Sequence, residues 1–239
     1  MKKSIDLSLI LPCYNEEKIF TESVISIQSV LDGSRLSYEI IFVDDGSRDA
    51  TPRYIKKLCA HDHRCRALFH PKNTGRGKAV ADGFLSARGT IVGYMDIDCE
   101  VPPVYIPDIV RMLLGGKVDG VVGKRVYRTT VSSLIREILS VGYKKLVSSL
   151  LHTGGMDTES GYKFFLRKKI LPVLSECHDP HWFWDTEIIV FSLRRGLRIL
   201  EYPVLFLRRF DKSSSVRIVS DPVRYVQSIL SLIPRLKET

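Results

Sequence analysis

Two pairs of acidic residues end two of the apolar runs that we expect to be strands. Asp44 and Asp45 follow the second such run of the chain, and Asp96 and Asp98 follow the fourth. The carboxyl ends of parallel strands meet at one edge of an open sheet, and ligands bind in the crevice there. We therefore expect both acidic pairs to lie in the same crevice.

The spacing of Asp96, Asp98 and Glu100 is that of side chains on one side of an extended segment. Adjacent carboxylates repel each other unless a cation lies between them. Mg²⁺ is commonly held by one or two carboxylates together with phosphate oxygens. The spacing thus predicts a site for Mg²⁺ or Mn²⁺ and a substrate diphosphate, with Glu100 as a third ligand. The alternative is a solvated acidic turn that caps the next helix.

Asp45 and the end of the first apolar run could form a nucleoside site. A carboxylate at a strand end can accept hydrogen bonds from a ribose hydroxyl or a base N–H group. The alternative is an N-cap for the following helix, a role that Ser47 or Asp49 would fill equally well. Tyr14 and Glu16 add an aromatic ring and a carboxylate to the same rim, where Tyr14 is either a partner for the base or an exposed loop residue.

Basic residues occur in two segments that could meet phosphate. The sequence Gly-Arg-Gly-Lys at 75–78 lacks the Ser or Thr and the spacing of a P-loop, so a P-loop is excluded. Arg208, Arg209, Lys212 and Arg217 come late in the chain. Side chains there could neutralise a diphosphate leaving group or an acceptor phosphate, and a solvated basic face is the alternative.

The elements that must position these residues alternate in the first part of the chain. Buried strands are expected at 7–11, 38–43, 66–70 and 90–95, with helices at 15–31, 51–60 and 79–87. Unbroken apolar strands that alternate with helices predict an α/β fold with a mostly parallel sheet covered on both faces. Further on, we expect helices at 104–114, 132–151, 185–195 and 223–233 and strands at 120–123 and 198–207. The chain shows no repeat or low-complexity linker, so residues 1–239 are expected to form a single domain.

Composition limits the partners. The net charge of +9 calls for an anionic partner, but the basic residues are scattered and form no nucleic-acid-binding motif, so we expect no nucleic acid. No stretch approaches the ~18–20 apolar residues that cross a bilayer, and the N-terminus reads as the start of the fold rather than a signal peptide. We expect a cytoplasmic protein, peripheral to a membrane. The five cysteines lack metal-ligand spacing and are expected to be reduced thiols.

Four segments in this order resemble the family 2 glycosyltransferases with the GT-A fold. They are Leu-Pro-Cys-Tyr-Asn-Glu at 11–16, Val-Asp-Asp-Gly-Ser at 43–47, Asn-Thr-Gly-Arg-Gly-Lys at 73–78 and Asp-Ile-Asp at 96–98. The resemblance covers nearly the whole chain and implies a Rossmann-like three-layer sandwich. The later segments 157–165, 184–187 and 201–204 look like those of dolichyl- or polyprenyl-phosphate mannosyl- and glucosyltransferases.

The resemblance also implies roles for individual residues. The residues implied to hold the nucleoside are Pro12, Tyr14, Glu16, Val43 and Asp45. Those implied to hold the metal and the diphosphate are Asp96, Ile97 and Asp98 with Glu100, and those implied to contact phosphates are Arg125 and Arg209. Mannosyl-phosphate synthases have a lysine six residues after the late arginine. This chain has Ser215 there, with Lys212 or Arg217 as substitutes.

The implied enzyme moves a hexose from GDP-mannose or UDP-glucose to a polyprenyl or dolichyl phosphate, with inversion in a single displacement. The acceptor phosphate is already anionic near neutral pH, so no strong general base is needed. The alternatives are a family 2 enzyme with a saccharide or other non-lipid acceptor, and a nucleotidyltransferase. The amphipathic stretches 132–151 and 222–236 are expected either to lie on an anionic membrane surface or to pack on the sheet. A separate membrane-spanning partner is compatible with this function.

Overall fold

The computed structural model describes residues 4–127, 148–208 and 220–238. Within them, seven strands form one sheet in the order β3-β2-β1-β4-β6-β5-β7. Their bounds are Leu7–Cys13 (β1), Tyr38–Asp44 (β2), Cys65–Phe69 (β3), Ile91–Met95 (β4), Gly120–Tyr127 (β5), Tyr162–Leu166 (β6) and Ile199–Phe206 (β7). Strand β6 runs antiparallel to both of its neighbours, and the remaining pairs are parallel. The expectation of a mostly parallel sheet is confirmed.

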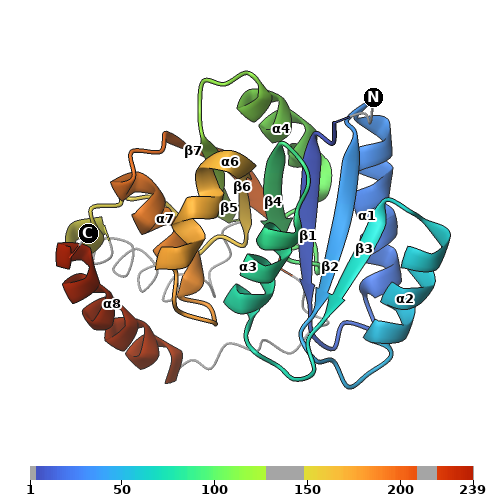
Figure 1. The fold of residues 1–239 in the computed structure, drawn as a ribbon, viewed down its shortest axis with the longest axis horizontal. Coiled ribbons are helices and arrows are strands. Elements are labelled where there is room, and N and C mark those ends of the chain that lie inside the picture. Colours follow the sequence, from blue (N-terminus) through green and yellow to red (C-terminus); the bar gives the residue numbers. More distant parts are fainter. Residues whose placement is uncertain (1–3, 128–147, 209–219, 239) are drawn as a thin grey trace.

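Helices cover both faces of this sheet, as Figure 1 shows. On one face lie α1 (Phe20–Gly33), α2 (Thr51–His61), the 3₁₀ turn η1 (Pro103–Tyr105) and α4 (Ile106–Leu114). On the other lie α3 (Arg76–Ser86), α6 (Arg167–Ile170), η3 (Leu171–Glu176), α7 (Trp184–Arg194) and α8 (Ser220–Glu238). Alternate residues of β1 divide between two apolar cores: Leu9 and Leu11 pack toward α1, and Ile10 packs toward α3. The α/β three-layer sandwich is confirmed.

Strand β1 leaves its neighbour β4 before it ends. The β1–β4 pairing stops at Ile10 and Tyr94, whereas the β1–β2 pairing continues to Cys13 and Asp44. Pro12 therefore lies beyond the β4 ladder, where its missing N–H group costs no hydrogen bond on that side. Because the strand order reverses between β1 and β4, this point has the position of a ligand crevice in an open α/β sheet.

Several elements differ from the expected ones. Helix α1 begins at Phe20 rather than at residue 15, because the preceding loop bonds to residues 47–51 and Asn15 has a φ of 57°. Strand β6 was not predicted, since its sequence Tyr-Lys-Phe-Phe-Leu carries a buried lysine. Strand β5 runs four residues beyond Gly123, to Tyr127.

The two amphipathic stretches have different outcomes. Residues 128–147, most of the expected helix 132–151, lie outside the described residues. Helix α8 buries Ile229 and Leu232 in the core beneath α7, so this helix packs on the fold through part of its apolar face. None of the helices in the described ranges is long and apolar enough to cross a membrane.

Candidate functional site

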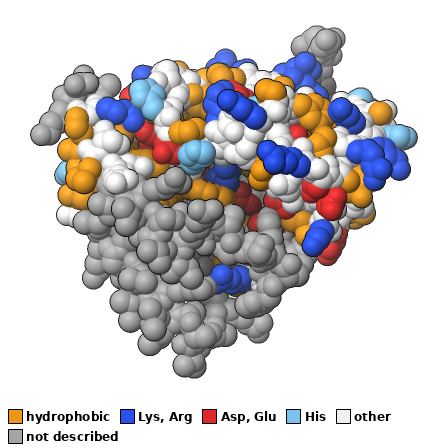
Figure 2. All heavy atoms as spheres, turned by 90° about the horizontal axis from the view of Figure 1, so that it is seen from below, with side chains coloured by type: hydrophobic (Ala, Val, Ile, Leu, Met, Phe, Trp, Pro, Cys, Tyr) orange, Lys and Arg blue, Asp and Glu red, His pale blue; other side chains and the backbone are white. Residues whose placement is uncertain are grey.

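The acidic pairs lie at the same edge of the sheet. Asp44 is the last residue of β2, and Asp96 directly follows β4, with the end of β1 between these two parallel strands. Figure 2 views the molecule from this edge, where Asp and Glu side chains lie among Lys and Arg side chains. The placement expected from the strand ends is therefore confirmed, although the individual residues differ in what they contact.

The loops after β1 and β2 are joined by hydrogen bonds. The backbone N–H of Asn15 donates to Ser47 Oγ at 2.9 Å, and that of Glu16 donates to Thr51 Oγ1 at 2.8 Å. Ser47 thus joins two loops rather than capping α2. Tyr14 is 42% exposed beside these joined loops, and its contact with a base stays a prediction.

Asp45 organises the loop before α3. Its carboxylate accepts bonds from Thr74 N at 2.8 Å, Thr74 Oγ1 at 2.7 Å and Gly75 N at 2.8 Å, and it lies 2.8 Å from His70 Nδ1. Burial alone raises the pKa of Asp45, but the hydrogen bonds from His70, Thr74 and Gly75 outweigh it and hold the pKa below its usual value. The described residues already supply four contacts to this buried carboxylate, and its nucleoside contact stays a prediction.

Asp44 has far fewer hydrogen-bond partners than Asp45 among the described residues. Its Oδ2 accepts a long bond from Ser47 N at 3.3 Å, whereas its buried Oδ1 has no hydrogen-bond partner among the residues the structure describes. A buried acceptor without a partner is costly, so its occurrence at a strand end calls for an explanation. A ligand N–H group at the crevice would satisfy it. Asp44 and Asp45 are neighbours at the end of β2, and the sequence alone does not indicate which of them faces a ligand and which organises the loop.

Two residues predicted to touch the donor are buried in this structure, and their donor contacts stay predictions. Val43 is fully buried in the core that faces α3, and Ile97 is buried in the core that faces α1. Pro12 is half-buried beside Val43 in the β1–β2 register.

The extended alternation expected for residues 96–100 is wrong. Ile97 and Asp98 form a turn, Cys99 has a φ of 56°, and the N–H of Glu100 donates to Asp98 Oδ1 at 3.2 Å. Across the described ranges no three His, Cys, Asp or Glu side chains gather closely enough to hold a metal. The proposed metal site therefore reduces to Asp96 and Asp98, completed by substrate oxygens, which is a common arrangement for Mg²⁺. Glu100 as a third ligand has no support from this geometry.

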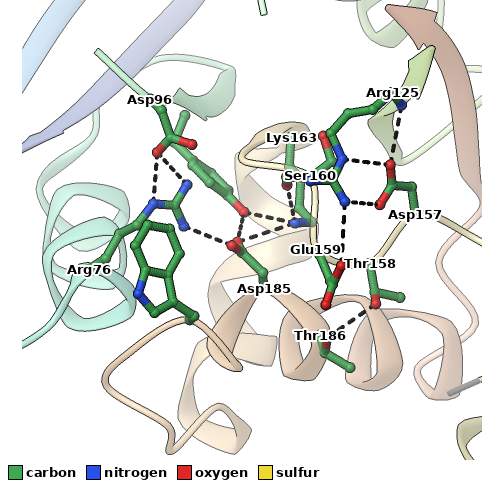
Figure 3. A network of polar contacts seen from close by, with 12 residues as sticks. Arg76, Asp96, Arg125, Asp157, Thr158, Glu159, Ser160, Lys163, Asp185 and Thr186 are labelled. Carbon is green, nitrogen blue, oxygen red and sulfur yellow. Dashed lines mark hydrogen bonds and ion pairs between the residues drawn. The ribbon is translucent and has the colours of Figure 1, made fainter. Parts of the chain in front are cut away.

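Arg76 holds Asp96 from the first position of α3 (Figure 3). Its Nε and Nη2 lie 2.7 and 2.6 Å from Asp96 Oδ1, and its Nη1 lies 2.8 Å from Asp185 Oδ2 on α7. Burial raises the pKa of the Asp96 carboxyl, and the Arg76 guanidinium opposes that rise. In the sequence, Arg76 belongs to a segment rejected as a P-loop and counted among the four family-like segments, but no role was assigned to Arg76 itself, so its contact with the acidic triplet was missed.

A buried lysine extends this network into the protein. Lys163 of β6 is 0% exposed, and its Nζ lies 3.0 Å from Tyr94 Oη and 3.2 Å from Asp185 Oδ1. Tyr94 also donates to Asp185 Oδ1. Burial lowers the pKa of Lys163, whereas the charge of Asp185 works against that change. Charged groups removed from water require such partners, and α7 supplies the carboxylate at its first turn.

Arg125 lies at the end of β5 and is engaged by acidic residues in this structure. Its Nε and Nη2 donate to the two oxygens of Asp157 at 2.9 and 2.7 Å, and Nη2 lies 3.5 Å from Glu159 (Figure 3). A phosphate contact by Arg125 stays a prediction. The expected roles of Arg209, Lys212, Ser215 and Arg217 fall on residues outside the described ranges.

Comparison with known proteins identifies the family. The model described as "Glycosyl transferase family 2" matches residues 8–174, which include both acidic pairs. The chain belongs to glycosyl transferase family 2. The resemblance seen in its four short segments is thereby confirmed.

Curated family 2 relatives match most of this chain. Glycosyltransferase AglD of Haloferax volcanii is 32% identical over 84% of this chain, which spans 33% of that protein. A dolichyl-phosphate beta-glucosyltransferase of Saccharomyces cerevisiae is 29% identical over 84% of this chain and 67% of its own length. One of Dictyostelium discoideum is 30% identical over 92% of this chain and 74% of its own length. The chain thus spans only part of these relatives.

Solved structures with the same fold include glucosyl-3-phosphoglycerate synthase of Mycobacterium tuberculosis. Its complex with Mn²⁺, uridine diphosphate and glucosyl-3-phosphoglycerate has a TM-score of 0.67 and 23% identity, and the match covers 94% of this chain and 77% of that one. At this identity the likeness shows the shared GT-A fold.

Proposed function

We propose that this chain is a hexosyltransferase that moves a sugar from a nucleotide sugar to a dolichyl or other polyprenyl phosphate. One observation carries the proposal: the ends of β2 and β4, on either side of β1, bring Asp44, Asp96 and Asp98 to one edge of the sheet in a family 2 chain. The relatives named dolichyl-phosphate beta-glucosyltransferases favour a lipid phosphate acceptor and a glucosyl donor such as UDP-glucose. GDP-mannose remains the other donor to test.

The residues of the crevice divide the work of donor binding. The nucleoside would lie between the Pro12–Glu16 rim and the carboxylate of Asp44, with Val43 contributing backbone and Asp45 keeping loop 73–75 in place. Asp96 and Asp98 would hold Mg²⁺ or Mn²⁺ against the diphosphate, and their pairing without a third carboxylate fits a metal that shares substrate oxygens. A bound divalent ion supplies neutralisation of the charge on the departing nucleoside diphosphate.

The acceptor phosphate has to be positioned by the protein and does not have to be activated by a strong base. A phosphate monoester is already an anion near neutral pH, so a single displacement with inversion requires it to be held in line with the anomeric carbon. Arg125 and Arg209 are proposed to contact phosphate, and Arg125 would exchange part of its contact with Asp157 and Glu159 for the acceptor. The net charge of +9 supports work at an anionic membrane surface on the cytoplasmic side, with or without a membrane-spanning partner.

A donor and acceptor panel tests this function. The chain is incubated with UDP-glucose or GDP-mannose, Mn²⁺ and polyprenyl phosphate in anionic vesicles, and both the lipid-linked product and the released nucleotide are measured. We expect a nucleoside diphosphate and a glycosylated lipid phosphate, with a yield that falls in neutral vesicles or at high salt. Release of pyrophosphate would instead identify a nucleotidyltransferase. Turnover with saccharide acceptors alone would identify the non-lipid alternative.

Asp44 and Asp45 are expected to respond differently to the same substitution. Asp44→Asn removes the negative charge of the acceptor proposed for the base and replaces one of its two oxygens with an NH₂ donor. It should weaken UDP or GDP binding by about 10–100-fold, the value of one charge-assisted hydrogen bond. Asp45→Asn disturbs loop 73–75 and should lower the melting temperature more than Asp44→Asn does. Isothermal titration and thermal unfolding of both variants measure these effects. Unchanged nucleotide affinity in Asp44→Asn would remove this residue from the donor site.

A further inference from the structure

The guanidinium of Arg76 pairs with Asp96, which is one of the two carboxylates proposed to bind the metal. Both of its contacts with Asp96 fall on the same oxygen, Oδ1, and its third contact crosses to Asp185 on another element (Figure 3). The guanidinium carbon lies 5.3 Å from the ring centre of Tyr94 and 4.9 Å from that of Trp182. The side chain is thus fixed on two sides by carboxylates and faced by two aromatic rings.

One side of this ion pair is packed closely against Gly161. A Cβ atom on Gly161 would come within 2.1 Å of Asp96 Oδ2 and 2.5 Å of Arg76 Nη2. A side chain at position 161 would therefore displace the charged end of Asp96 or of Arg76. The close packing keeps Arg76 beside Asp96 on the Gly161 side, while the side chain of Asp96 is 37% exposed and open to a ligand.

The network pairs two cations with two carboxylates, namely Arg76, Lys163, Asp96 and Asp185. The charge of Asp98 also acts on Asp96, so the site keeps one carboxylate beyond these pairs. A divalent ion arriving alone at Asp96 would place two further positive charges beside the guanidinium of Arg76, whose side chain is only 10% exposed, and this repulsion is unfavourable. A nucleoside diphosphate that arrives with the ion brings compensating negative charge. Arg76 can then keep Asp185 while Asp96 turns to the metal.

We propose that Arg76 is an internal counter-ion that holds Asp96 in the free protein and thereby makes divalent-metal binding depend on the nucleoside diphosphate. This role rests on the proposed function, because it assigns Asp96 to the metal. Arg76 is a positioning residue in this scheme: it sets the free energy of coupling between two ligands rather than acting on the sugar.

Manganese titrations followed by electron paramagnetic resonance test this coupling without turnover. In the unmodified protein, we expect UDP or GDP to lower the Mn²⁺ Kd by at least about tenfold, within the usual range of coupling between sites. Arg76→Gln should tighten binding of Mn²⁺ alone by about tenfold and reduce the effect of the nucleotide to less than about threefold. Lys78→Gln is the matched control, since Lys78 lies on the same helical turn but pairs with Asp82 at the surface. Its coupling should equal that of the unmodified protein.

Arg76→Lys provides the second variant if the glutamine protein does not fold. Lysine keeps the buried charge balance but cannot span Asp96 and Asp185 as the guanidinium does, so its coupling should lie between those of the unmodified and glutamine proteins. Undiminished coupling in the Arg76 variants that fold would overturn the role of Arg76 and leave the proposed function intact. Absence of Mn²⁺ binding by the unmodified protein, with UDP and with GDP, would contradict the proposed function itself.

Discussion

Replacement of Asp98 by alanine is expected to lower the rate of metal-dependent sugar transfer by at least about a hundredfold, because the metal then loses one of its two protein carboxylates. Asp98 lies in the turn after β4, where its Oδ1 already accepts the Glu100 N–H. The variant should keep its fold, since the turn also has the Cys99 N–H bond to the Asp96 carbonyl. Initial rates at saturating donor, measured across Mn²⁺ concentrations, give the result.

Asp108→Ala is the control for this substitution. Asp108 is an exposed carboxylate on α4 that pairs with Arg111 at the surface, and its removal should leave the rate unchanged. Near-normal transfer by Asp98→Ala over the whole range of Mn²⁺ would refute a metal role for the acidic triplet. If excess Mn²⁺ fully restored the transfer rate of Asp98→Ala, Asp98 would affect only the affinity for the metal. The expected hundredfold loss of rate at saturating metal would then be wrong.

The largest loss of stability is expected from Lys163→Met. Lys163 is completely buried and its ammonium pairs with Asp185. Removing one member of a buried ion pair leaves the other uncompensated, which typically costs about 3–5 kcal/mol in the free energy of unfolding. Arg76 still contacts Asp185 and offsets part of this cost. Equilibrium unfolding in urea, followed by circular dichroism, measures the difference.

An exposed lysine offers a matched comparison. Lys124 pairs with Glu201 at 2.9 Å, but its side chain is 55% exposed, so Lys124→Met should cost less than about 1 kcal/mol. The double variant Lys163→Met, Asp185→Asn should cost less than the sum of its single changes, because the two groups interact directly. Equal losses from Lys163→Met and Lys124→Met would contradict a structural role for the buried network.

The sequence predicted well those features that local patterning determines. The apolar runs of β1, β2 and β4 are fully or almost fully buried, and the acidic residues end β2 and follow β4, so an alternating α/β pattern sufficed to bring them to one edge. The pattern of strands and helices is less regular after Ile97, because contacts with distant parts of the chain determine the structure there. Strand β6 lies between β4 and β5 and pairs antiparallel with both. It was not predicted because its buried lysine interrupts the apolar pattern that indicates a buried strand.

The errors within the candidate site have two physical origins, a local turn and contacts between distant elements. The alternation of Asp96, Asp98 and Glu100 assumed that the strand continues, whereas the chain turns immediately after Asp96. The contact between Arg76 and Asp96 joins residues from α3 and β4, and that between Lys163 and Asp185 joins β6 and α7. Pairs formed across elements leave no periodic signal in a single sequence, so only the folded arrangement reveals them.

The close contact of Gly161 with Asp96 and Arg76 has a consequence for protein engineering. Enlarging residue 161 would displace the charged ends of a carboxylate and a guanidinium side chain, so substitutions at positions 76, 96 and 161 are expected to depend on one another. Varying positions 76 and 161 together, with the aspartate retained, would exchange the volume of the arginine for that of a new side chain and so open a route to altered metal preference.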